Sequence, residues 1–204
     1  MRVLSWRACP VVLVALACTD ATAPIAPLEG TAALLNNGSG VVIQAMGAGV
    51  VDFNPAGDVG DGTFQFVAIQ RADGTVTGHF YQSRVRATGL VEFYGDVTCV
   101  SIDPNFPGRA RIGGIVTVNN STDPAFLTVN HEVGDDVWFR VEDSGNGTGT
   151  GQKSTTYGFK PTLVNTSEEY CALPFSGTHN GQDVWNPASI FPLASGTIRV
   201  NPGL

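Results

Sequence analysis

Basic residues are scarce in this 204-residue chain, which has 11 lysines and arginines against 18 aspartates and glutamates. Lys153 and Lys160 are the only lysines. Arg2 and Arg7 lie in a leading segment that we expect to be removed, and taking these two from 11 leaves 9 basic side chains and a formal charge of about −9. Such a surface repels nucleic-acid phosphates and anionic headgroups, so we expect no nucleic-acid partner.

The apolar run that follows these two arginines is short. It extends from Ala8 to Ala17 without a charged side chain. A helix needs about 20 apolar residues to cross a bilayer, so this run is too short to span one. Two positive charges followed by a short apolar run are the layout of an export signal. We therefore predict a signal peptide at residues 1–17.

The expected cleavage site has small residues just before Cys18. The segment Val14-Ala15-Leu16-Ala17-Cys18 resembles the lipobox of bacterial lipoproteins, which implies lipid on the Cys18 thiol and attachment to a membrane. Ordinary secretion fits the same residues and would cut the same bond. Thr19 after the cysteine favours an outer-membrane lipoprotein, with a periplasmic or secreted soluble protein as the alternative. Residues 18–39, rich in Ala, Thr, Pro and Gly, are predicted to be a lipidated, flexible tether.

Cysteines are few, and their number is informative. Cys9 is lost with the signal peptide, which leaves three. If Cys18 carries lipid, Cys99 and Cys171 remain as a pair in a compartment that permits disulfides. We predict a Cys99–Cys171 disulfide, with two buried free thiols as the alternative.

Charged residues make up only 14% of the chain, Gly numbers 25, and no stretch shows a sustained period of 3.6 residues. This composition is typical of all-β domains with tight turns. We predict a single all-β domain at residues 40–204, an antiparallel meander that closes into a small β-barrel. A two-sheet β-sandwich is the alternative.

Alternation and turn residues locate the strands. Asp73-Gly74 between two alternating runs is a strong hairpin signal. The predicted strands are Val41 to Phe53, Thr63 to Arg71, Thr75 to Ser83, Leu90 to Ile102, a return strand with Ala110, Ile112, Gly114, Val116 and Val118 facing inward, Leu127 to His131, Asp136 to Asp143, and Gly196 to Val200. Alternation places Cys99 on the core side of its strand.

The passage from Thr162 to Ala194 is long and irregular, which is unusual inside a compact domain. We expect it to lie over the sheet, pinned by Cys171. Its apolar residues Trp185, Ile190 and Phe191 are predicted to plug one end of the barrel.

Several blocks between Gly62 and Val200 resemble a group of bacterial exported proteins that have no assigned activity. The blocks are Gly95-Asp96-Val97-Thr98-Cys99-Val100, Ile112-Gly113-Gly114-Ile115-Val116, Val137 to Gly147 with its Asp-x-Gly-x-Gly ending, and Gly196-Thr197-Ile198-Arg199-Val200. The resemblance implies one contiguous β-domain and no particular chemistry.

The sequence shows no recognisable catalytic or metal-binding motif, so we predict no catalytic residue, metal or cofactor. The Gly145 to Ser154 segment departs from a phosphate loop, because Gln152 separates Gly151 from Lys153. The histidines His79, His131 and His179 are far apart in sequence, and we expect each to be at the surface or hydrogen-bonded. Two arginine pairs, Arg84 with Arg86 and Arg109 with Arg111, each lie on one strand face. Solvated strand ends explain them, with a small anion-binding patch as the alternative.

These observations favour a non-enzymatic lipoprotein of the cell envelope that binds a partner or small ligand through the loop end of its barrel. The candidate segments are residues 145–154 and 175–191, because loops on a rigid scaffold commonly carry function. The alternatives are an extracellular hydrolase acting on carbohydrate or cell wall, and a purely structural or adhesive module. The sequence leaves the ligand and the oligomeric state open.

Overall fold

A computed structural model describes residues 40–51, 61–128, 131–144, 153–154, 164–185 and 190–203. The predicted signal peptide, the tether and Cys18 lie outside these residues, as does most of the Gly-rich segment from Gly145.

The described chain is almost entirely β-structure. Its strands are β1 (Val41–Val51), β2 (Gly62–Arg71), β3 (Val76–Arg86), β4 (Gly89–Ile102), β5 (Arg109–Asn119), β6 (Asp136–Glu142), β7 (Lys153–Ser154), β8 (Thr178–His179), β9 (Gln182–Asp183) and β10 (Phe191–Asn201). Two short helices, α1 (Pro124–Leu127) and α2 (Ser167–Ala172), complete the set. Neither helix, nor any other in the described ranges, is long and apolar enough to cross a membrane.

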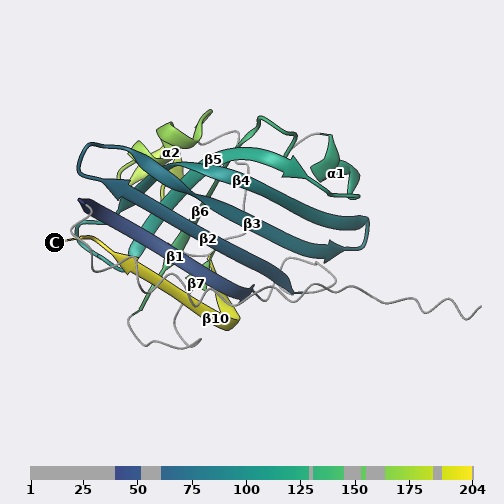
Figure 1. Ribbon diagram of the computed structural model, residues 1–204, viewed down its shortest axis with the longest axis horizontal. Coiled ribbons are helices and arrows are strands. Elements are labelled where there is room, and N and C mark those ends of the chain that lie inside the picture. The colour runs from purple at the N-terminus through teal and green to yellow at the C-terminus, as the bar shows by residue number, and fades with distance from the viewer. Residues whose placement is uncertain are drawn as a thin grey trace, which may run out of the picture. The chain divides into compact units, whose positions relative to one another are not determined.

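Eight strands form a closed antiparallel barrel in the order β1-β10-β7-β6-β5-β4-β3-β2 (Figure 1). Strands β1 to β6 follow one another as a meander, and β10 returns to pair with β1 from Gln44↔Asn201 to Val51↔Leu193. Closure between β6 and β10 depends on β7, which pairs with both through only two residues. The predicted all-β barrel is confirmed.

The predicted β2–β3 hairpin is confirmed. The amide of Arg71 donates to the carbonyl oxygen of Thr75 across the turn, and the amide of Thr75 donates to Asp73 Oδ1 at 2.9 Å. Gly74 has a φ of 85°, which favours glycine at this place in the turn.

Phenylalanines fill the middle of the barrel. Phe66 and Phe139 meet edge to face with ring centroids 5.2 Å apart, and Phe80 lies 6.4 Å from Phe139. Glycines opposite these rings provide the space, since a Cβ on Gly95 would lie 2.0 Å from Phe80 Cζ. The fully or nearly buried core comprises Ala45, Val51, Phe64, Phe66, Ala68, Phe80, Val91, Phe93, Val97, Val100, Ala110, Ile112, Val116, Phe126, Val137, Phe139, Val141, Leu193 and Ile198.

Two irregularities in the pairing of β4 with β5 turn Cys99 and Val118 outward, although both were expected to face the core. The register shifts between Val97 and Cys99 and again between Tyr94 and Gly95. The first shift puts Val100 into the core in place of Cys99, which faces the outer side. The second leaves Val118 45% exposed. A bulge inserts one residue and so reverses the inside-outside alternation beyond it.

The strand expected at Leu127 to His131 is wrong. Leu127 is instead the last residue of helix α1, which begins after Asp123, whose carboxylate accepts a hydrogen bond from the amide of Ala125. Pro124 at the first helical position suits a helix start, because its missing N–H would have had no partner there. Residues 129–130 lie outside the described residues.

Candidate functional site

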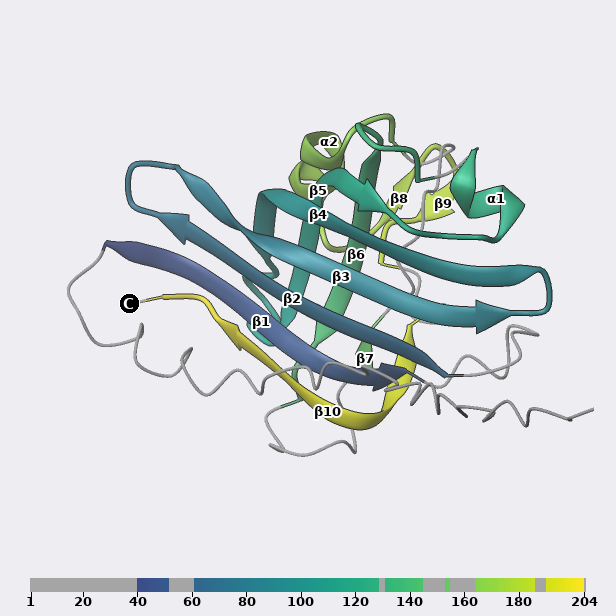
Figure 2. The same ribbon diagram turned by 45° about the vertical axis from the view of Figure 1, so that its right-hand side comes forward.

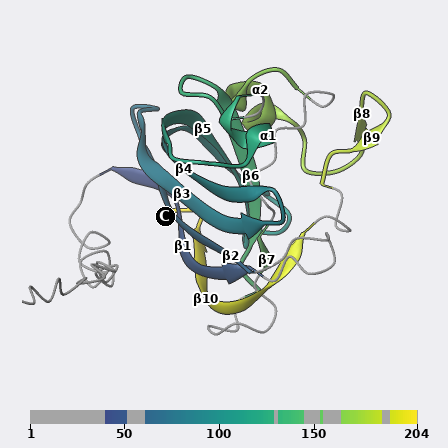
Figure 3. The same cartoon turned by 90° about the vertical axis from the view of Figure 1, so that its right-hand side faces the viewer.

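A segment that we call the strap, residues 164–185, covers the outer face of the barrel wall. Its helix α2 packs against β4, β5 and β6. The small β8–β9 hairpin follows α2 and stands outside the barrel wall (Figures 2 and 3). The expectation that the irregular passage lies over the sheet is confirmed for residues 164–185, whereas residues 191–194 belong to strand β10.

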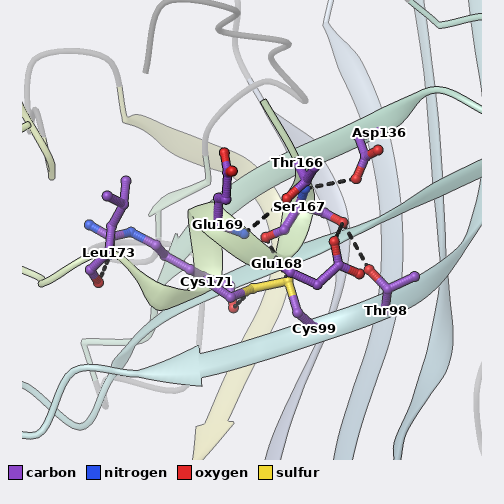
Figure 4. Close-up of a disulfide and its surroundings, with 10 residues drawn as sticks. Thr98, Cys99, Asp136, Thr166, Ser167, Glu168, Glu169, Cys171 and Leu173 are labelled. Carbon is purple, nitrogen blue, oxygen red and sulfur yellow. Dashed lines mark hydrogen bonds between the residues drawn. A yellow bond between two sulfur atoms is a disulfide. The ribbon is translucent and has the colours of Figure 1, made fainter. Parts of the chain in front are cut away.

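A disulfide fixes the strap to the barrel (Figure 4). The Sγ atoms of Cys99 on β4 and Cys171 on α2 lie 2.11 Å apart, which confirms the predicted pairing. Beside it, the hydroxyls of Thr98 and Ser167 are 2.9 Å apart, and the Ser167 amide donates to Asp136 Oδ1 at 2.7 Å. Gly113 permits this approach, because a Cβ there would lie 2.6 Å from the Ser167 Cβ.

Arg111 is the second attachment of the strap. Its side chain is fully buried and donates hydrogen bonds to the backbone carbonyl oxygens of Leu173, Pro174 and Val184, the last at 2.9 Å. One guanidinium thereby joins both ends of the loop that contains the β8–β9 hairpin. Burial lowers the pKa of Arg111 below its ordinary value.

The expectation of solvated arginines at the strand ends is wrong for two of the four. Arg84 is 9% exposed and Arg111 is fully buried. Each pair does lie on one strand face. Arg84 is buried because its face of β3 is turned to the barrel interior, and Arg111 is buried because the strap covers the outer face of β5. Arg140 on β6, directly opposite Arg111 in register, is also buried.

Aromatic side chains of the strap stack against these arginines. Tyr170 stacks on Trp138 of β6 with ring centroids 5.7 Å apart, and Phe175 lies 5.8 Å from Trp185. The guanidinium of Arg111 lies over the Phe175 ring at 4.5 Å. Trp138 and Tyr170, together with Val164, Leu173 and Val184, form a second hydrophobic cluster.

Trp185 does not plug the barrel. Its ring packs on the outer side against the guanidinium of Arg109 at 5.0 Å and that of Arg140 at 5.6 Å. Phe191 instead packs against the barrel core from β10, and Ile190 is buried. The plug prediction is therefore wrong for Trp185.

A pocket of about 400 Å³ opens in the strap, between α2 and the β8–β9 hairpin. We call it the strap pocket. Its aliphatic lining is Val164, Ala172, Leu173 and Pro174, and its polar lining is Asn165, Glu169, His179 and Asn180. Aliphatic residues with a few polar groups around them are a typical composition for a ligand site.

The lining of the strap pocket is held in place on several sides. Ala172 follows the disulfide, and the carbonyls of Leu173 and Pro174 are bonded to Arg111. Glu169 Oε2 accepts a hydrogen bond from the amide of Asn165 at 2.8 Å. Asn180 has a φ of 51° in the Asn-Gly turn of the hairpin, a conformation that asparagine tolerates well.

A second pocket, of about 310 Å³, lies at the turn between β4 and β5. It is lined by Asn105, Phe106, Pro107, Gly108, Arg109, Glu142, Asp143 and Ser144. Arg109 Nε donates to Glu142 at 3.1 Å, and its guanidinium lies 4.4 Å from the Phe106 ring. Of the two candidate segments, 175–191 contributes His179 and Asn180 to the strap pocket, whereas residues 145–152 of the other lie outside the described residues.

The histidines do not gather into a site. His79 is exposed and His179 lines the strap pocket. His131 is buried, contrary to expectation, and neither ring nitrogen has a hydrogen-bond partner. Within the described ranges, His, Cys, Asp and Glu side chains form no cluster of three or more that could hold a metal ion.

Sequence reasoning overlooked Arg140 and placed Arg111 at a solvated strand end, although both groups are important to the strap. The sequence did hold one signal for their burial. Each arginine alternates with core residues in a strand of low charge, and so faces the same outer side as Cys99. Comparisons with protein-family models, curated proteins and solved structures gave no match to this chain.

Proposed function

We propose that the protein is an exported, lipid-anchored binding protein of the bacterial cell envelope, with Cys18 as the lipidation site and the strap pocket as the binding site. The strap pocket carries this proposal, because it joins an aliphatic lining to four polar side chains on a covalently fixed segment. Binding sites are most selective when rigid elements hold the side chains that contact the ligand directly.

The chemistry of the strap pocket favours a short peptide with an apolar side chain next to a basic one. An aliphatic side chain fits against Leu173 and Val164, and asparagine amides suit a peptide backbone. Glu169 contributes a carboxylate, and none of the described lining residues is a lysine or arginine. The acidic charge of the whole chain attracts a basic partner in the same way.

An NMR titration tests this binding mode. We expect acetyl-Leu-Lys-amide at millimolar concentration to shift the backbone amide signals of Asn165, Ala172 and Asn180, and acetyl-Leu-Glu-amide to shift them much less. Ala172→Trp, which fills the pocket, should abolish the shifts, whereas Ala87→Trp at an exposed turn should leave them unchanged. Equal shifts from both peptides, or shifts that survive Ala172→Trp, would contradict the proposal.

Intact-mass analysis of the protein purified from bacterial membranes tests the anchor. We expect the mature chain to begin at Cys18 and to carry diacylglycerol on its thiol and an acyl group on its amino terminus. Two or more acyl chains make attachment effectively permanent. Cys18→Ala should release the domain into the soluble fraction, and an unmodified Cys18 in the wild-type chain would refute the anchor.

A further inference from the structure

A capping segment closes the barrel beside the β3–β4 hairpin. We call residues 119–128 and 131–135 the cap. Asn119 Nδ2 donates to the carbonyl oxygens of Phe126 and His131, at 2.7 and 2.6 Å, and so joins its two halves. The Asp123 carboxylate accepts hydrogen bonds from Thr88 Oγ1 and from Arg86 at 3.3 Å, which ties the cap to β3.

His131 lies at the centre of the contact between the cap and the barrel core. Its imidazole packs between the ring of Phe93 on β4, 4.4 Å away, and the ring of Phe126 on α1, 4.8 Å away. The side chain is 1% exposed, and within the described residues both Nδ1 and Nε2 are inaccessible and lack a hydrogen-bond partner. No group in the described part of the chain therefore stabilises an added proton on either nitrogen.

The neighbouring charges also oppose a positive charge on His131. From β3, the guanidinium groups of Arg84 and Arg86 lie over the Phe126 ring at 5.1 and 5.2 Å. From the cap, the Asp123 carboxylate is engaged by Arg86 and Thr88. On the segment that carries His131, Glu132 is exposed and its amide donates to Asp135 Oδ2. Phe93 on β4 adds an uncharged ring.

We propose that the cap is an acid-sensitive latch, in which a neutral His131 keeps the barrel end closed and its protonation in mildly acidic surroundings releases the cap. Opening exposes the imidazole to water, where its charged form is solvated. The latch is independent of the strap pocket and of the proposed binding function.

The direction of the pH effect follows from linkage. Burial, and secondly the charge of Arg84, lowers the pKa of His131 from 6.5 to about 3 in the closed state. Above pH 6.5 the closed cap has its full stability, and this stability is lost progressively as the pH falls from 6.5 towards 3. The opening equilibrium constant then rises by about tenfold per pH unit, or about 30-fold between pH 7.5 and pH 5. A hydrogen bond from Thr88 holds the pKa of Asp123 below its ordinary value, so this carboxylate stays ionised between pH 7.5 and pH 5.

Native-state hydrogen exchange, corrected for the intrinsic pH dependence of exchange, tests the latch on the full mature chain. The reporters are the amides of Phe126 and Leu127, which donate to the Asp123 carbonyl. Between pH 7.5 and pH 5 we expect their opening constants to rise about 30-fold, while amides in the middle of β2 change much less.

Substitutions assign the effect to His131. His131→Phe should remove the pH dependence, and His131→Met is the second variant if the larger ring does not fit. His79→Phe, at an exposed position on β3, is the matched control and should keep it. The latch is overturned if Phe126 and Leu127 open equally at both pH values, if His131→Phe retains the wild-type dependence, or if His131 titrates near pH 6.5 with the cap still closed.

Discussion

Gly95→Val is expected to lower the free energy of unfolding by about 3 kcal/mol or more. A Cβ at this position would lie 2.0 Å from Phe80 Cζ and 2.2 Å from the carbonyl oxygen of Ile115. Rotation of the Phe80 ring can relieve the first contact but not the second, because the Ile115 oxygen belongs to the neighbouring strand. Urea unfolding followed by circular dichroism gives the measurement.

Two comparisons separate this overpacking from the general cost of changing a strand residue. Thr77→Val, on the exposed side of β3, should change the free energy of unfolding by less than about 0.5 kcal/mol. Phe80→Leu should recover part of the stability lost in Gly95→Ala, since it removes the ring that the new methyl group meets. A loss below about 1 kcal/mol in Gly95→Val would show that the barrel centre is looser than the structure indicates.

Loss of the Cys99–Cys171 disulfide is expected to cost about 4 kcal/mol. The two cysteines are separated by 72 residues, and a cross-link over such a span removes much of the freedom of the unfolded chain. We expect the double substitution Cys99→Ser with Cys171→Ser to shift the urea midpoint accordingly. Because Arg111 still holds the strap, the barrel itself should keep its fold.

The double alanine variant serves as the control for the hydroxyl groups that serine introduces. Both variants should lose similar stability if the cross-link is responsible. A loss below about 1 kcal/mol in both variants would contradict this expectation, because it would show that the disulfide adds little stability to the noncovalent contacts of the strap.

Local signals in the sequence predicted much of the barrel. Asp73-Gly74 located the first hairpin, because only a few residue pairs suit such a turn. Alternation in β6 puts Val137, Phe139 and Val141 on one face of the strand, and in the structure that face is buried in the core. The cysteine count led to the disulfide without any knowledge of the fold.

What escaped prediction depended on contacts between distant segments or on a single inserted residue. Alternation was followed through Cys99 and Val118 without a break, whereas the register shifts in both strands. Arg111 was expected at the surface because arginine is rarely buried alone, yet three carbonyls of the strap compensate its burial. His131 is likewise enclosed by rings from β4 and α1, which no short-range pattern brings together.

The start of α1 is a missed element that did have a local signal. Asp123 followed by Pro124 is a common helix beginning, but the apolar residues after it suggested a strand. A helix of four residues is too short to show a period, so only its capping residues could have indicated it.

The closure of the barrel through the two residues of β7 has a consequence for how the domain comes apart. Strands β1 to β5 share long ladders, whereas among the described residues Lys153 and Ser154 alone pair with both β6 and β10. In the described part of the barrel, the seam at β7 is therefore where the fewest ladder hydrogen bonds must break for the cylinder to become an open sheet. Under denaturant or heat the domain should unroll from this seam, while the disulfide keeps the strap attached to β4.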